Sequence, residues 1–365
     1  MTKNDFILML VRSALWQSPL DSFKMTPWEY KEVMDVAEKQ CVTGLVTDCL
    51  KSNGVNLQKK CVVHMLQLQN TLTMNNRALD KGIVELSQLF NKHKIRYAVV
   101  KGQTIAAFYP KPSLRIPGDI DFWVAPHDIT KAIDVLNKAW GTTLKKEQFG
   151  LKHIGFDYNG LKYEFHKNLL ALTTRKNIKY LDKLIDSTPN HQITIGQYKQ
   201  VMVPEPTVNV LYTFCHLFHH LRIEGVAWRQ LCDWAVMMKH YQSEINNTKL
   251  LEYLRTMGYT KAYAAFGSII IKKLGYPESD FPMSITSEDE KWGNKIHEDI
   301  LKHGNWGIYD SGIGDKHILS NKIKFWFAGI CRYVKYFGLA PKETLSFTLC
   351  SIPTMMIGWL RGTRS

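Results

Sequence analysis

Residues 97–124, YAVVKGQTIAAFYPKPSLRIPGDIDFWV, decide the fold of this chain. The apolar run at 97–100 predicts a short buried strand, which ends at a turn containing Gly102. A second strand carries Asp119 and Asp121, and because side chains alternate along a strand, both carboxylates point to one face. Two carboxylates this close repel each other, and Mg²⁺ is commonly held by one or two of them together with substrate phosphates. The stretch therefore predicts a divalent-cation site.

A third carboxylate follows on a later strand. Residues 152–158 and 161–166 alternate apolar and polar side chains, and the Asn-Gly dipeptide at 159–160 is the strongest short-range hairpin signal in the chain. Glu164 and His166 share one face of the second strand. We expect this strand to lie beside that of the two aspartates, where Glu164 would complete a group of three acids.

The α/β part lies between two helical regions. With 365 residues, the chain is long enough for two domains, or for one domain with helical extensions. We divide it into an N-terminal helical region (1–94), an α/β core (95–205) and a C-terminal helical region (206–365). The predicted fold class is α+β, with a small mixed sheet and flanking helices. Residues 169–203 look irregular apart from a strand at 200–203.

Apolar residues recur at helical spacing through both flanking regions. The segment TPWE at 26–29 supplies an N-cap, a proline at the first helical position and an acid in the first turn. We expect helices over 26–41, 43–51, 57–93, 126–141, 206–240 (as a pair), 248–275 and 288–303, and a loop over 304–314.

The charge balance favours an anionic partner. The chain has 47 Lys and Arg against 33 Asp and Glu, a formal net charge of +14. A basic protein of this kind attracts nucleoside triphosphates, nucleic acids, acidic glycans or anionic membrane surfaces, although the charge also serves solubility alone. We find no recognised RNA- or DNA-binding module, so nucleic acid is not the partner we expect.

Cysteine usage and the apolar runs indicate a cytoplasmic protein. The seven cysteines are scattered without a CxxC motif, which is typical of reduced core residues rather than a disulfide framework or zinc site. The N-terminus lacks a small-residue cleavage site, and no apolar run reaches about 18 residues. Lys322, Lys324, Arg332 and Lys335, with aromatic neighbours, leave open a peripheral contact with an anionic membrane.

The order of these motifs resembles the DNA polymerase β-like nucleotidyltransferase superfamily, and more closely its bacterial family of uncharacterised nucleotidyltransferases. That family shows the patterns "LKG…Y…R…DhDhhV" and "EhHW", and a helical "H…W…D" segment. The resemblance extends over nearly the whole chain. The matching residues are Val100-Lys101-Gly102, Tyr109, Arg115, Asp119-Ile120-Asp121-Phe122-Trp123-Val124, Glu164-Phe165-His166-Lys167, and His216 or His220 with Trp228 and Asp233.

The resemblance implies a role for each of these residues. Catalysis and the binding of one or two Mg²⁺ would fall to Asp119, Asp121 and Glu164. Nucleotide contacts would come from Lys101, Gly102, Gln103 and Arg115: the glycine lets the backbone approach phosphate, and the two cations neutralise it. His166, His220 and Asp233 would contact substrate or orient the groups that do. The sequence departs from the superfamily at Gln103, where Ser or Gly is more common.

Several of these residues have a structural alternative. Lys101 and Arg115 are alternatively surface or salt-bridged cations, and Asp233 an ion pair that fixes the helical region. His166 is alternatively a partly buried histidine without a chemical role. His216 and His220 share a helix face, but the segment has neither a nearby third ligand nor the inner Glu of a zinc protease.

These observations predict a Mg²⁺-dependent nucleotidyltransferase. It would move a nucleoside monophosphate from an NTP such as ATP to a small-molecule or protein acceptor. Two alternatives stay open. One is a non-catalytic nucleotide-binding protein, and the other is an accessory protein of a surface-polysaccharide or peptide-modification pathway.

Overall fold

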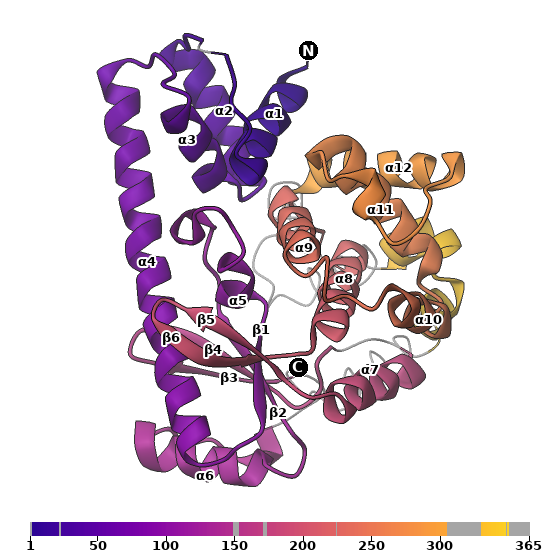
Figure 1. The fold of residues 1–365 in the computed structure, drawn as a ribbon. Coiled ribbons are helices and arrows are strands. Elements are labelled where there is room, and N and C mark those ends of the chain that lie inside the picture. Colours follow the sequence, from indigo (N-terminus) through magenta and orange to yellow (C-terminus); the bar gives the residue numbers. More distant parts are fainter. Residues whose placement is uncertain are drawn as a thin grey trace, which may run out of the picture.

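The computed structural model of this chain describes residues 2–21, 23–148, 153–170, 174–223, 225–304, 330–347 and 349. Its described elements begin with helices that lie before the first strand (Figure 1). These are α1 (Lys3–Trp16), α2 (Pro27–Lys39), α3 (Thr43–Ser52) and α4 (Lys59–Lys92). They confirm the helices expected over 26–93.

Helix α2 begins where the sequence places its cap. The Thr26 side chain accepts a hydrogen bond from the Glu29 backbone N–H, and Glu29 accepts from the Thr26 backbone N–H, so the capping box is complete. Helix α4 is long and runs alongside the sheet (Figure 1). Gly82 allows this close approach, because a Cβ there would lie 2.7 Å from the Tyr163 hydroxyl and 2.6 Å from Leu161 Cδ1.

The central sheet joins strands from both halves of the α/β part. Its strand order is β1-β2-β4-β3, in which β2 and β4 are parallel and the other neighbours antiparallel. The strands are β1 (Tyr97–Val100), β2 (Ile120–Val124), β3 (His153–Tyr158) and β4 (Leu161–His166). The hairpin at 159–160 is confirmed, since Asn159 and Gly160 have φ of 51° and 74°, as a two-residue turn requires.

The buried strands β1 and β2 divide their side chains between two apolar cores. Val99 and Phe122 pack with α4 residues in one core, whereas Val100 and Trp123 pack in the other, which continues into the N-terminal and C-terminal helices. A strand buried on both faces has apolar residues throughout, and the burial of every β2 residue fits this. Asp121 is therefore a carboxylate inside an otherwise apolar strand.

Shorter helices connect and cover the sheet. Between the first two strands lie α5 (Gly102–Ala106) and the 3₁₀ turn η1 (Pro112–Leu114), and α6 (Ile129–Trp140) with η2 (Lys146–Gln148) follows β2. The α+β prediction is confirmed, with a small mixed sheet and flanking helices. The limits of the three predicted regions stay a prediction.

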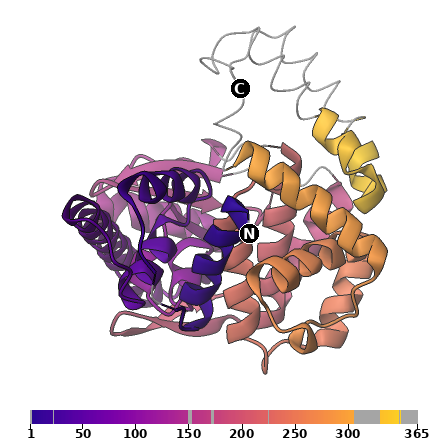
Figure 2. The ribbon, with the colours of Figure 1, turned by 90° about the horizontal axis from the view of Figure 1, so that it is seen from above.

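The C-terminal helices pack against the N-terminal ones. Trp16 of α1 donates a hydrogen bond from Nε1 to the Leu274 carbonyl at 2.6 Å. Figure 2 shows the indigo N-terminal helices on one side and the orange C-terminal helices on the other. The described elements of this part are α8 (Pro206–Ile223), α9 (Trp228–His240), α10 (Asn247–Met257), α11 (Thr260–Leu274), η3 (Glu278–Asp280), α12 (Ser287–His303) and η5 (Phe337–Leu339). They confirm the helices predicted over 206–303.

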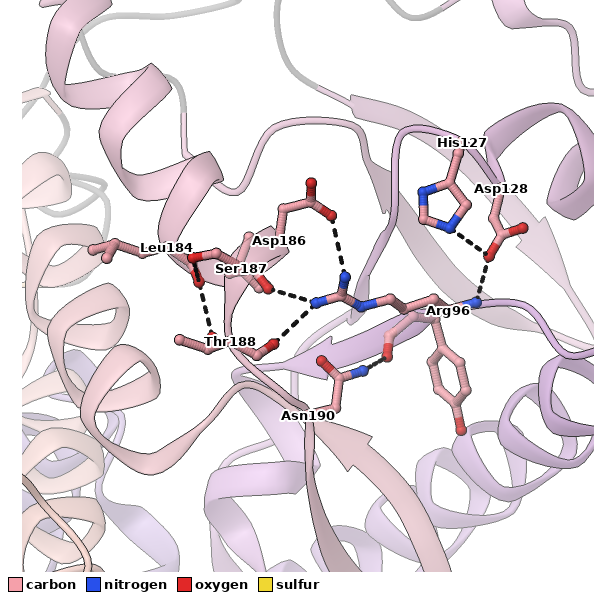
Figure 3. Close-up of polar contacts among 10 residues, drawn as sticks. Arg96, His127, Asp128, Leu184, Asp186, Ser187, Thr188 and Asn190 are labelled. Carbon is pink, nitrogen blue, oxygen red and sulfur yellow. Dashed lines mark hydrogen bonds and ion pairs between the residues drawn. The ribbon is translucent and has the colours of Figure 1, made fainter.

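The prediction that residues 169–203 are mostly irregular is wrong. This segment forms helix α7 (Arg175–Ser187) and a second, antiparallel sheet of β5 (His191–Ile195) and β6 (Tyr198–Val203). Arg96, just before β1, holds the end of α7: its guanidinium donates to the Ile185 carbonyl at 3.0 Å and the Thr188 carbonyl at 2.9 Å, and pairs with Asp186 at 3.3 Å (Figure 3). The helix end is therefore fixed by a residue about 90 positions earlier.

The basic C-terminal part is described only in places. The loop expected over 304–314 lies outside the described residues apart from Gly304, as do Lys322 and Lys324. Lys335 forms an ion pair with Asp299 of α12. None of the helices formed by the described residues combines the length and apolar character needed to cross a membrane.

Candidate active site

Strand register brings the predicted acids together. In the parallel pair of β2 and β4, Asp121 lies opposite Glu164, and Trp123 lies opposite His166. Asp119 comes just before β2 and is exposed. Since neighbouring positions across a sheet point to the same face, Asp121 and Glu164 lie side by side.

A cavity of about 520 Å³ opens beside these carboxylates. Known ligand sites have about 300–1,000 Å³, so the cavity is large enough for a small-molecule substrate. Its walls come from the α5 and β2 segments, from β4, and from helices α8 and α9. Of the predicted site residues, it is lined by Lys101, Gly102, Arg115, Asp119, Asp121, Glu164, His166, His220 and Asp233.

Of the three acids, Asp121 is the most buried, and it contacts two basic side chains. It is 7% exposed, and its Oδ1 lies 2.7 Å from Lys101 Nζ and 2.8 Å from His166 Nε2. Burial opposes ionisation of Asp121, but the neighbouring positive charge of Lys101 and the hydrogen bond from His166 outweigh it and hold its pKa well below the usual range. Asp121 is therefore ionised.

The same contacts act on its two partners. Burial disfavours the charged form of Lys101, yet the charge of Asp121 outweighs burial and raises the pKa of Lys101 above its ordinary value. Burial likewise opposes protonation of His166, while hydrogen bonds to Asp121 and Glu164 raise its pKa. Lys101 and His166 thus contact the Asp121 carboxylate from two sides.

Asp119 has the opposite electrostatic environment. Partial burial raises its pKa, and the negative charges of Asp121 and Glu164 raise it further. A like-charge group of this kind is stabilised when a cation binds among the carboxylates. Oxygen donors of three acids match the preference of hard divalent cations.

The turn between β1 and α5 has an unusual backbone. Lys101 has φ 58° and ψ −157°, a region that residues with a Cβ rarely adopt, and Gly102 has φ 49°. A Cβ on Gly102 would lie 3.2 Å from the Asp119 carbonyl. The turn therefore lies tightly against the aspartate segment and directs the Lys101 ammonium to Asp121.

Gln103 is the one predicted site residue that does not line the cavity. Its buried amide nitrogen lies 2.7 Å from Asp80 Oδ1 and 3.4 Å from the Asn76 carbonyl, both on α4. The residue that departs from the superfamily pattern thus ties α5 to the long helix. Its contact with nucleotide stays a prediction.

Arg115 and Asp233 form a buried pair with two contacts. Arg115 Nε and Nη2 each lie 2.7 Å from an Asp233 oxygen, and the Tyr109 hydroxyl donates to Asp233 Oδ1 at 2.7 Å. The pair joins the segment before β2 to helix α9. This geometry matches the salt-bridge alternative for both residues, and contact of Arg115 with nucleotide stays a prediction.

The histidines of α8 extend the network from Lys101. His216 Nε2 lies 3.2 Å from Lys101 Nζ and 3.0 Å from His220 Nε2. Burial and the adjacent Lys101 charge lower the pKa of His216 well below its ordinary value, so its ring is neutral. The predicted shared face of His216 and His220 is confirmed, and it points toward the lysine that pairs with Asp121.

Two cavity residues were missed in the sequence, although signals for them were present. His153 lies opposite His166 in the hairpin. The sequence contains this information, because counting outward from a two-residue turn at 159–160 pairs residue 153 with residue 166. Arg229 lies one helical turn before Asp233 and so shares its face. Burial and the nearby charge of Arg115 lower the pKa of Arg229, and its side chain lines the cavity together with Arg115 and Asp233.

Among the comparisons with known proteins, the match to a family model agrees with the motifs. No protein of curated function matches the chain. Among solved structures, an antigenic nucleotidyltransferase-like protein from Paracoccidioides brasiliensis matches with a TM-score of 0.32 and 13% identity, over 56% of this chain and 96% of that chain. The sequence model of a family described as uncharacterised nucleotidyltransferases matches residues 26–270, from α2 into α11. The chain belongs to this uncharacterised nucleotidyltransferase family.

Proposed function

We propose that this chain is a Mg²⁺-dependent nucleotidyltransferase that transfers a nucleoside monophosphate from an NTP to a hydroxyl or amine of a small molecule or protein. The observation that carries the proposal is the register that sets Asp121 beside Glu164, with Asp119 at the same cavity. Membership of the family supports transfer of a nucleotide. The metal and the acceptor are our inference.

The three carboxylates fit a hard divalent cation. Asp119 is exposed, and its raised pKa arises partly from the charges of Asp121 and Glu164, which a bound cation would offset. When bound, Mg²⁺ neutralises phosphate oxygens and favours the ionised form of the attacking oxygen. The cavity beside them is large enough for the substrate.

The chain's own cations would hold the triphosphate. The Lys101 side chain is 17% exposed, and its Nζ faces the acids. A phosphate oxygen could therefore replace Asp121 as the partner of this ammonium. Gly102 presents backbone without a side chain at the same turn. Arg229 adds a planar guanidinium at the α9 wall, suited to a phosphate or to an anionic acceptor.

A non-catalytic nucleotide-binding or accessory protein is the second candidate. One observation favours it: Asp121 already has Lys101 at 2.7 Å and His166 at 2.8 Å, so this carboxylate is satisfied without a cation. A protein that senses nucleotide needs the cavity and its cations, but it does not need Asp119 to act on the reaction.

Pyrophosphate release separates the two candidates. Wild type, Asp119→Asn, Asp121→Asn and the exposed control Asp157→Asn would be incubated with Mg²⁺, each NTP and a mixture of small molecules and proteins that supplies hydroxyl and amine acceptors, and nucleotide binding measured by calorimetry. Release by wild type and Asp157→Asn, with a loss of about 100-fold or more in the other two, supports the enzyme. Binding without release by any variant supports the second candidate. Absence of Mg²⁺-nucleotide binding by wild type refutes both.

A further inference from the structure

Two imidazoles and a carboxylate meet on the cavity face of the sheet. His153 on the edge strand β3 lies opposite His166 on β4, and Glu164 lies two residues before His166 on the same face. One ligand atom from each of the three side chains lies within 4.8 Å of the others. The arrangement follows from strand register, so adjacent rigid strands fix the positions of these side chains.

We propose that His153, Glu164 and His166 form a site for a divalent transition-metal ion of the Zn²⁺ class. Imidazole nitrogen suits Zn²⁺ and its neighbours in the first transition row, whereas Mg²⁺ prefers oxygen. Two histidines and one glutamate are a known set of three protein ligands for zinc, with a fourth position left for water or substrate. The cavity supplies that open side.

The distances favour a shared ion over direct hydrogen bonds. Glu164 lies 3.4 Å from His153 Nε2 through Oε1 and 3.3 Å from His166 Nε2 through Oε2. Charge-assisted hydrogen bonds between nitrogen and oxygen are shorter, at about 2.7–2.9 Å. Ligands about 2.05 Å from a tetrahedral ion lie about 3.3 Å apart. This is close to the separation of Glu164 Oε1 from the His153 ring and of Glu164 Oε2 from the His166 ring, with a different oxygen facing each histidine.

Asp121 is the nearest competitor for His166. Its Oδ1 lies 2.8 Å from His166 Nε2, and it also has Lys101 Nζ at 2.7 Å. When Nε2 of His166 binds an ion instead of Asp121, the Asp121 carboxylate keeps Lys101 as its partner. The carboxylate of Asp121 would then lie next to the ion and add negative charge that favours a dication.

This inference deepens the proposed function, because Glu164 belongs to both sites. The centre would be asymmetric: the side of Asp119 and Asp121 offers oxygen alone, and the side of His153 and His166 offers nitrogen. A metal pair sharing a carboxylate is a common design for phosphoryl chemistry. Binding of the transition ion can nevertheless be measured without any nucleotide.

Cobalt is the spectroscopic probe for this site. The full chain, freed of metal by a chelator, would be titrated with Co²⁺ and read by visible absorption, with Zn²⁺ binding followed by calorimetry. We expect one equivalent of Co²⁺ to give ligand-field bands that Zn²⁺ removes and equimolar Mg²⁺ does not. His153→Ala should weaken binding by more than about 100-fold, beyond the 10–100-fold typical of a residue that only supports a ligand.

The controls separate the site from folding and from catalysis. His153 is partly exposed on an edge strand, so His153→Ala should keep the wild-type circular dichroism. His127→Ala removes an exposed histidine that does not line the cavity. Equal Co²⁺ affinity of wild type and His153→Ala, or absence of the bands in wild type, overturns the proposal. Asp119→Asn should keep the bands and lose pyrophosphate release, so either inference can fail alone.

Discussion

Replacing Asp233 with alanine should destabilise the protein by about 5 kcal/mol. Arg115 and Asp233 are 5% and 8% exposed by their side chains, and two contacts of 2.7 Å join them. Removing one partner of a buried pair costs about 3–5 kcal/mol, because the other charge stays buried without compensation. The Tyr109 hydroxyl also loses its acceptor at 2.7 Å, a further loss of about 1 kcal/mol. Such a change is a large part of a typical stability of about 5–15 kcal/mol.

Urea unfolding followed by tryptophan fluorescence measures this loss. Lys239→Ala is the matched control, because Lys239 is on the same helix and makes a partly exposed pair with Asp280, for which we expect less than about 1 kcal/mol. The double replacement Arg115→Met with Asp233→Leu should recover most of the stability, since the Arg115 charge is removed together with that of its partner. A loss below about 1 kcal/mol in Asp233→Ala, equal to the control, would refute a structural role for the pair.

Three further predictions concern other parts of the chain. Burial lowers the pKa of His297 to about 4, below the ordinary value of about 6.5, so the unfolded state binds more protons in this window. Stability should fall by up to about 3 kcal/mol as the pH drops from about 6.5 to 4, and His297→Gln should remove this slope in unfolding curves recorded at several pH values. Arg229→Gln should raise the KM for NTP or for an anionic acceptor about tenfold. It should not lower the free energy of unfolding, because it removes the repulsion between Arg229 and Arg115. Unchanged kinetics would contradict this prediction. Gly44→Ala should destabilise by about 1–3 kcal/mol in urea, since its Cβ would lie 1.7 Å from the Leu114 carbonyl, whereas Gly155→Ala meets no atom within 4 Å and should have no comparable effect.

Local patterns were sufficient to predict the sheet and its acids. The hairpin follows from the Asn-Gly turn, and the pairing of β2 with β4 follows from where the apolar strands and their carboxylates stand in the sequence. Alternation then places Asp121 and Glu164 on one face. The hairpin and the alternation depend on residues a few positions apart, which is the range over which periodicity carries information. The pairing of β2 with β4 joins residues more than 40 positions apart, and the periodicity alone does not specify it.

Helix α7 was missed although its apolar residues recur at helical spacing, because charged residues are frequent among them and the support of the helix is distant. Its buried apolar positions, Leu181 and Ile185, lie among many charged residues, and its end is held by Arg96 from before β1. The partners of Gln103 on α4 and of Arg115 on α9 were hidden for the same reason. Gln103 and Asp80 are more than 20 residues apart in the sequence, and Arg115 and Asp233 more than 100. A local pattern cannot show that such distant side chains will meet.

Lys101 connects the acids of the sheet to the helical part of the cavity. Its ammonium lies 2.7 Å from Asp121 and 3.2 Å from His216 of α8, and that histidine lies 3.0 Å from His220. A cation that binds Asp121 competes with Lys101, so we expect the lysine to be released toward phosphate or toward the histidines when the cation binds. Because His216 is neutral, it can accept a hydrogen bond from the released ammonium. Cation binding on the sheet and the cavity wall of α8 should therefore be coupled through one side chain.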